Sequence, residues 1–113
     1  MSARSAAAAD PSHVAPVFAA LGDTTRLALV ARLCDAGPLS IARLTTGSDL
    51  TRQAITKHLE VLARAGLVSG VRRGRQRIWS LAPAHLEQAR GWLDDVSSQW
   101  DRALDRLRRF VEE

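Results

Sequence analysis

Residues 51–62, TRQAITKHLEVL, predict a helix with two chemically different faces. Ile55, Leu59 and Leu62 recur at intervals of four and three residues, so one face is apolar and is expected to pack on a core. Thr51 is placed to cap the N-terminus of this helix, and Gly66 to end it. The other face holds Arg52, Gln53, Thr56, Lys57 and Glu60.

The polar face of this helix is not the usual mixture of glutamate and lysine. Its N-terminal half carries Arg, Gln and Thr, which can contact guanine, adenine and the methyl group of thymine. We therefore predict that the helix reads DNA bases, although an ordinary solvated face would explain the helix taken alone. For His58, a donor to phosphate and a polar link to the turn are equally good interpretations. The predicted DNA-binding residues of the helix are Thr51, Arg52, Gln53, Thr56, Lys57 and His58.

A shorter helix is predicted just before this one. Ser40 is placed to cap residues 41–46, IARLTT, and Gly47 to end them. Two helices that meet across a tight turn form a helix-turn-helix, in which the outer face of the second helix projects from the domain.

Residues 13–21 predict the first helix of the chain, because Val14, Val17 and Phe18 fall at helical spacing. Pro16 is tolerable only in the first turn of such a helix. Residues 1–12 show no apolar periodicity, so we expect a disordered tail there, followed by one domain over residues 13–113.

A further helix is predicted between Gly22 and Gly37, with Asp23 or Thr24 as its cap. We expect Cys34 to be a buried small hydrophobic residue on this helix and not a redox-sensitive thiol. Cys34 belongs to an apolar stripe that comprises Leu27, Val30, Ala31 and Cys34. Leu29 and Leu33 lie beside this stripe.

Residues 67–81, LVSGVRRGRQRIWSL, alternate apolar and polar side chains around a glycine and predict two strands joined by a hairpin. Four arginines are crowded at the tip of this hairpin, and the repulsion among their charges opposes folding. Contact with phosphates or with the minor groove of DNA would relieve that repulsion. A solvated turn is the alternative. Trp79 is expected to pack on the core. The predicted DNA-binding residues of this wing are Arg72, Arg73, Arg75 and Arg77.

The charge distribution supports a polyanionic partner. Residues 50–81 hold seven basic residues against one acidic residue, Glu60, whereas the net charge of the whole chain is only +4. Positive charge concentrated in one third of a chain favours nucleic acid as the partner.

The overall composition is that of one ordinary globular domain, with 46% hydrophobic and 25% charged residues. No run of about 18 apolar residues and no export signal occur, so we expect a cytoplasmic protein without membrane contact. The single cysteine excludes an internal disulfide.

The C-terminal region predicts one long helix from Pro83 to about Val111. Its apolar residues repeat every seven positions, and at 1.5 Å per residue the helix is on the order of 40 Å long. Because that length exceeds what a small domain can cover, we expect a homodimer; folding back on its own domain is the alternative. The predicted interface comprises Val14, Phe18, Leu86, Ala89, Leu93, Val96, Trp100, Ala103, Leu107 and Phe110.

A helix-turn-helix followed by a basic hairpin is a winged helix, and the motifs here resemble one family. LGDTTR at residues 21–26, QAITKHLEVLARAGLV at residues 53–68 and the Arg/Gly wing are similar to ArsR-type bacterial transcriptional repressors. The resemblance covers residues from about 14 to 111. It implies a mainly α-helical winged helix-turn-helix with a two-stranded hairpin. It also implies a homodimer that binds an inverted repeat near promoters and blocks transcription until a signal lowers its affinity.

The ligand positions of the family's metal sensors do not match here. The Cys-x-Cys pair of those sensors corresponds to Ser40 and Ala42, which supply no thiolate. A second site of the family uses Asp and His ligands on the C-terminal helix, but no histidine follows His85 here, so Asp94 and Asp95 have no imidazole partner at useful spacing. We therefore expect no metal and no cofactor, as in a branch of the family that does not sense metals.

Other classes of function are weaker interpretations of the sequence. No Gly-rich phosphate loop and no nucleophile paired with a histidine are evident, so we do not expect an enzyme. A winged helix that binds a protein or RNA is the more serious alternative, because the fold does not define the ligand. Side chains that read bases suit the wide major groove of B-DNA better than the narrow one of A-form RNA.

Overall fold

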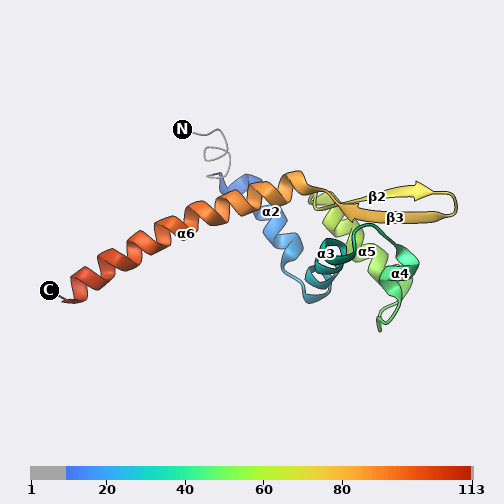
Figure 1. Cartoon of the computed structure of the whole chain (residues 1–113), viewed down its shortest axis with the longest axis horizontal. Coiled ribbons are helices and arrows are strands. Elements are labelled where there is room, and N and C mark those ends of the chain that lie inside the picture. Colours follow the sequence, from blue (N-terminus) through green and yellow to red (C-terminus); the bar gives the residue numbers. More distant parts are fainter. Residues whose placement is uncertain (1–9, 113) are drawn as a thin grey trace.

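The computed structural model describes residues 10–112, so residues 1–9 of the expected disordered tail lie outside the described part. The architecture is mainly helical, with a small antiparallel sheet and a long C-terminal helix (Figure 1), and it confirms the winged helix-turn-helix. The elements in chain order are α2 (Pro11–Leu21), α3 (Thr24–Ala36), β1 (Leu39–Ser40), α4 (Ile41–Thr45), α5 (Arg52–Arg64), β2 (Val68–Arg73), β3 (Gln76–Leu81) and α6 (Pro83–Glu112).

Helix α2 begins two residues earlier than the sequence suggested. The side chain of Asp10 accepts a hydrogen bond from the backbone N–H of Ser12, and Pro11 occupies the start of the helix. An aspartate cap followed by proline is a favourable helix start, because proline lacks an N–H that would be unpaired there. The prediction of a disordered tail was therefore wrong for residues 10–12, and Pro16 lies beyond the first turn.

Helix α3 buries a different face from the one expected. Asp23, one of the two predicted caps, begins this helix: its side chain accepts a hydrogen bond from the backbone N–H of Arg26. Leu29 and Leu33 lie in the core, whereas Leu27 is 51% exposed and Cys34 is exposed. The prediction of a buried Cys34 was wrong, because the elements that pack on α3 contact the neighbouring stripe.

The predicted hairpin is present, and it gains a third strand. Strands β2 and β3 pair antiparallel, with Gly70 opposite Trp79, and two residues join them. Gly74 has a φ of 60°, which glycine adopts readily and which suits the first position of a tight hairpin turn. The two-residue strand β1 pairs with the other edge of β3, so the expectation of a two-stranded sheet was incomplete.

The core lies between the helices and the inner face of this sheet. Trp79 is buried there, as predicted, at 1% exposure. Its other members include Val17, Leu29, Leu33, Leu44, Ile55, Leu59, Leu62, Leu67 and Val68. All four helices before the hairpin contribute to this core, together with Leu67 and Val68 at the start of the hairpin, so the helix-turn-helix is held on a packed base.

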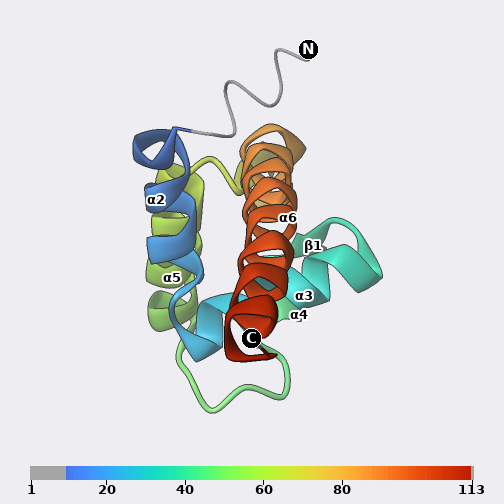
Figure 2. The same ribbon diagram turned by 90° about the vertical axis from the view of Figure 1, so that its left-hand side faces the viewer.

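Helix α6 leaves this core as it proceeds. Its first half lies beside α2 (Figure 2), where the rings of Phe18 and Trp92 meet edge to face with centroids 5.5 Å apart. Val14 and Ala89, which we expected at a dimer interface, are instead buried within the chain. From residue 98 to residue 112 every side chain is exposed, so the predicted excess of helix length is confirmed.

No single helix in residues 10–112 has the length and apolar character needed to cross a membrane. The bent pair α2 and α3 passes that test jointly, with an angle of 96° between its members.

Candidate nucleic-acid interface

Hydrogen bonds to the ends of α4 and α5 position the helix-turn-helix. The Ser40 hydroxyl accepts from the N–H of Arg43 at 3.2 Å, and the Thr51 hydroxyl accepts from the N–H of Ala54 at 3.1 Å, so both predicted caps are confirmed. The guanidinium group of Arg32 on α3 donates to the carbonyl oxygens of Leu44 and Arg43 at 3.0 and 3.1 Å. Arg32 thereby satisfies carbonyl groups in the last part of α4, a role the sequence analysis missed.

The two faces of α5 separate as the periodicity predicted. Ile55, Leu59 and Leu62 are at most 2% exposed. The opposite side forms a shallow hollow beside α4, lined by Ile41, Arg52, Gln53, Thr56, Lys57 and Glu60. An outward-facing row of polar side chains at the N-terminal end of a helix has the arrangement needed to enter a major groove.

Thr56 presents its methyl group more freely than its hydroxyl group. Its Oγ1 donates a hydrogen bond of 2.8 Å to the carbonyl oxygen of Arg52 on the same helix. The hydroxyl proton is therefore already used, which favours an apolar contact over hydrogen-bond donation to a base.

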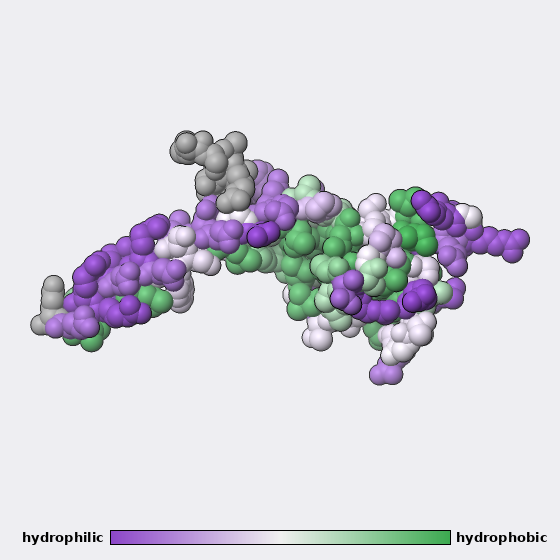
Figure 3. All heavy atoms as spheres, in the orientation of Figure 1, coloured by the Kyte–Doolittle hydropathy of each residue, from purple (hydrophilic) through white to green (hydrophobic). Residues whose placement is uncertain are grey.

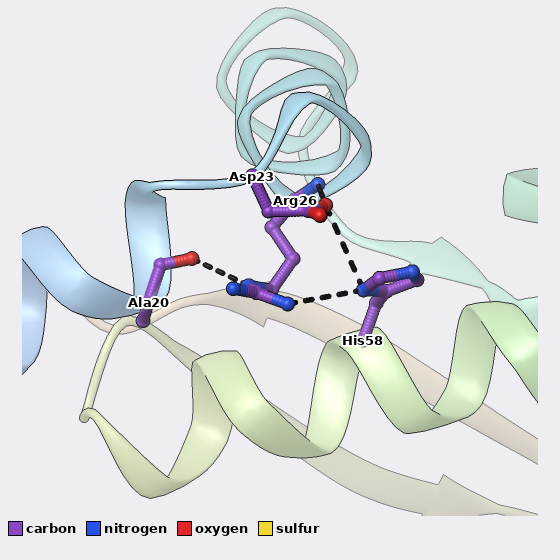
Figure 4. A network of polar contacts seen from close by, with 4 residues as sticks. All are labelled: Ala20, Asp23, Arg26 and His58. Carbon is purple, nitrogen blue, oxygen red and sulfur yellow. Dashed lines mark hydrogen bonds and ion pairs between the residues drawn. The ribbon is translucent and has the colours of Figure 1, made fainter.

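The structure favours the second interpretation of His58. Its Nδ1 lies 3.3 Å from a guanidinium nitrogen of Arg26 and 3.8 Å from a carboxylate oxygen of Asp23, at the turn between α2 and α3. Arg26 also donates through Nε to the carbonyl oxygen of Ala20 at 2.6 Å (Figure 4). His58 thus belongs to a polar link between α5 and the α2–α3 turn, and it is not part of the outward-facing row.

Asp23 carries the negative charge of this link. The hydrogen bond from the backbone N–H of Arg26, and secondarily the charge on its guanidinium group, hold the pKa of Asp23 below its usual value. Asp23 therefore remains ionised under conditions in which an ordinary aspartate begins to bind a proton.

The four wing arginines are all exposed, but they occupy two faces of the hairpin. Arg72 and Arg77 pair across the strands on the face that also holds Trp79, whereas Arg73 lies opposite Gln76 on the other face. Arg75 is in the turn. No ion pair to another residue within 10–112 engages any of the four, so their charge is free for a partner.

No group of three or more His, Cys, Asp or Glu residues in the described part of the chain could hold a metal ion. Among the four positions compared with those of the metal sensors, Ser40 caps α4 and Asp94 is exposed to solvent.

A helix-turn-helix whose second helix has an outward-facing polar row, next to an arginine-bearing hairpin, defines the winged-helix class of DNA-binding proteins. A model described as a helix-turn-helix domain matches residues 21–71. The chain is 36% identical to the HTH-type transcriptional regulator Rv2034 of Mycobacterium tuberculosis, over 82% of this chain and 83% of that protein. It is 40% identical to the uncharacterized HTH-type transcriptional regulator YuzN of Bacillus subtilis, over 69% of this chain and 92% of that protein.

A solved structure is similar to this chain in fold as well as in sequence. An ArsR-like transcriptional regulator from Rhodococcus sp. RHA1 superposes with a TM-score of 0.72 at 35% identity, over 88% of this chain and 92% of that one. The chain belongs to the ArsR family of helix-turn-helix transcriptional regulators. It is a DNA-binding regulator, and its family consists of transcriptional regulators and not of enzymes.

Proposed function

We propose that the protein is a sequence-specific repressor that binds an inverted repeat in double-stranded DNA as a homodimer. The observation that carries this proposal is the outward-facing row on α5, where Arg52, Gln53 and Lys57 are exposed beside Thr56. These groups offer directional donors to base edges, which a merely solvated helix would not require.

The helix and the wing have different tasks in this proposal. The row on α5 contacts base edges and selects the sequence, whereas the exposed wing arginines Arg72, Arg73, Arg75 and Arg77 contact phosphates. Binding should therefore weaken steeply as salt rises, because each neutralised phosphate releases counterions.

The dimer is supported by the outer half of α6. Leu93, Trp100, Leu107 and Phe110 are 48 to 78% exposed on one helix, and a monomer would leave them in water. A two-fold dimer presents two copies of α5 and so matches a palindromic site. A dimer bound near a promoter would obstruct transcription.

The test is a selection of bound sequences from random duplex DNA, followed by affinity measurements on Gln53→Ala. We expect an inverted repeat to be enriched, and Gln53→Ala to lose about 1–3 kcal/mol of preference at one base pair of each half-site. Arg64→Ala, an exposed arginine at the far end of α5, is the matched control and should keep the preference.

A competition among duplex DNA, duplex RNA and an acidic protein at physiological salt separates the alternatives. Tighter binding to RNA or to the protein, or no enriched DNA sequence, would rule out the proposed function.

A further inference from the structure

One apolar side chain, Ile41, lines the shallow hollow beside the polar row of α5. It is the first residue of α4, directly after the cap Ser40. Ile41 is half-buried, because part of it packs against the core while the rest borders the hollow. At the end of the molecule that holds α4 and the wing, Figure 3 shows hydrophobic residues exposed between strongly hydrophilic ones. A side chain anchored in the core gives the hollow an apolar wall of fixed position.

Thr56 supplies a second apolar group to the same hollow. Its Oγ1 donates to the carbonyl oxygen of Arg52 at 2.8 Å, so its hydroxyl proton is engaged and its methyl group remains for an apolar contact. Thr56 is half-buried on α5, and α5 packs on α4, the helix of Ile41. Two half-buried apolar groups from two helices therefore lie among exposed polar side chains, which are Arg52, Gln53, Lys57 and Glu60.

A C5-methyl group is the apolar feature that a base edge presents in the major groove. Thymine carries this methyl group, and so does cytosine that has been methylated at C5. The neighbouring group at C4 accepts a hydrogen bond in thymine and donates one in cytosine. Lys57 can donate to the first and Glu60 can accept from the second, and neither forms an ion pair within residues 10–112. The hollow suits either base, and the methyl group is what the two bases share.

We propose that the hollow between α4 and α5 is a receptor for the C5-methyl group of one pyrimidine in the bound DNA, with Ile41 as a specificity-determining residue. The inference rests on the proposed function. It adds a base-reading residue from outside α5, and it makes the affinity for an operator sensitive to methylation of cytosine at C5.

Pairs of duplexes that differ by a single methyl group test the receptor. In one half-site of the operator obtained by selection, each thymine is replaced in turn by uracil, and each cytosine in turn by 5-methylcytosine. We expect one position at which the duplex with the methyl group binds about fourfold more tightly, the value of one methyl group removed from water. A thymine at that position identifies thymine as the occupant of the hollow, and a cytosine there identifies 5-methylcytosine.

Variants of Ile41 assign the methyl effect to the hollow. Ile41→Ala should lower the ratio of the two affinities from about four to below about two, and the milder Ile41→Val should give an intermediate ratio. Because the ratio compares two duplexes with the same protein sample, any loss of folded protein cancels. Val30→Ala is the matched control and should keep the ratio of the parent. Val30 is also half-buried against the core, but it does not line the hollow.

The selection and the methyl comparison separate the two ways of failing. If an operator is enriched but no position shows a methyl effect, or if the effect is unchanged in Ile41→Ala, the receptor is overturned and sequence-specific binding stands. If no sequence is enriched, the proposed function fails, and the receptor fails with it because reading a methyl group creates a sequence preference.

Discussion

The guanidinium group of Arg77 lies over the indole ring of Trp79, with its central carbon 4.7 Å from the ring centroid. This contact orients one wing arginine through a residue of the core, because Trp79 is 1% exposed. Gly70 opposite Trp79 leaves room for the contact: a Cβ there would come within 3.0 Å of the ring and 2.8 Å of Nε of Arg77.

Arg77 and Arg75 should therefore respond differently to substitution. Arg75→Ala should weaken binding to all duplexes alike and lower the slope of log affinity against log salt by about one. Arg77→Ala should do the same and also destabilise the fold by about 0.5–1 kcal/mol, the value of an exposed cation–π contact. Salt-dependent affinity and denaturant unfolding measure the two effects. Equal stabilities of the two variants would show that the stacking contributes nothing.

Thr56 should act through its methyl group. Thr56→Val keeps a methyl group and loses only a hydroxyl whose proton is bound to the Arg52 carbonyl, so the operator preference should persist. Thr56→Ser keeps the hydroxyl and should lose about 1 kcal/mol of preference for thymine at the contacted position. The reverse order of effects would show that the hydroxyl reads the base.

His58 should matter for stability more than for DNA. His58→Ala removes the contacts with Arg26 and Asp23 and should lower the free energy of unfolding by about 1 kcal/mol. The affinity of the folded fraction for the operator should change less than twofold, since the imidazole is turned toward the α2–α3 turn. If His58→Ala kept full stability but bound DNA tenfold more weakly, the phosphate interpretation would be correct.

The lowered pKa of Asp23 predicts how its stabilisation of the N-terminus of α3 depends on pH. Because the folded state lowers this pKa, the stabilisation is complete above the unfolded value of 3.8 and disappears as pH falls through the lower folded value. Asp23→Asn keeps an acceptor for the N–H of Arg26 without a titrating group. The stability difference between the parent and Asp23→Asn should therefore shrink below pH 3.8, as measured by denaturant unfolding across the acid range. If the stability difference between the parent and Asp23→Asn stayed constant through that range, the Asp23 carboxylate would not be the source of the pH-dependent stabilisation.

DNA affinity should not respond to metal ions. Ser40 and Ala42 provide no thiolates, and the chain contains no histidine after His85. Titration with zinc, cadmium or arsenite during an operator-binding measurement should change the affinity less than twofold. A tenfold loss at stoichiometric metal would reveal a ligand set that the chain forms only when bound to DNA or to a second copy.

Local signals in the sequence determined most of the element boundaries. Ser40 and Thr51 cap their helices because their hydroxyl groups lie within three residues of the N–H groups they accept from. The apolar period of α5 also identified its buried face correctly, since its polar and apolar residues separate cleanly. Such signals depend on near neighbours along the chain, and near neighbours are visible in one sequence.

Features that depend on contacts between residues far apart in the sequence were decided only by the tertiary structure. On α3 two apolar stripes overlap, and only packing against α2, α5 and β3 buries Leu29 and Leu33 while leaving Cys34 exposed. His58 and Arg26 are 32 residues apart, so their contact follows from how α5 lies on the α2–α3 turn. Strand β1 has two residues, too few for a periodic pattern, and forms because β3 offers it a free edge. Each outcome depends on the position of a second element, which local propensity does not encode.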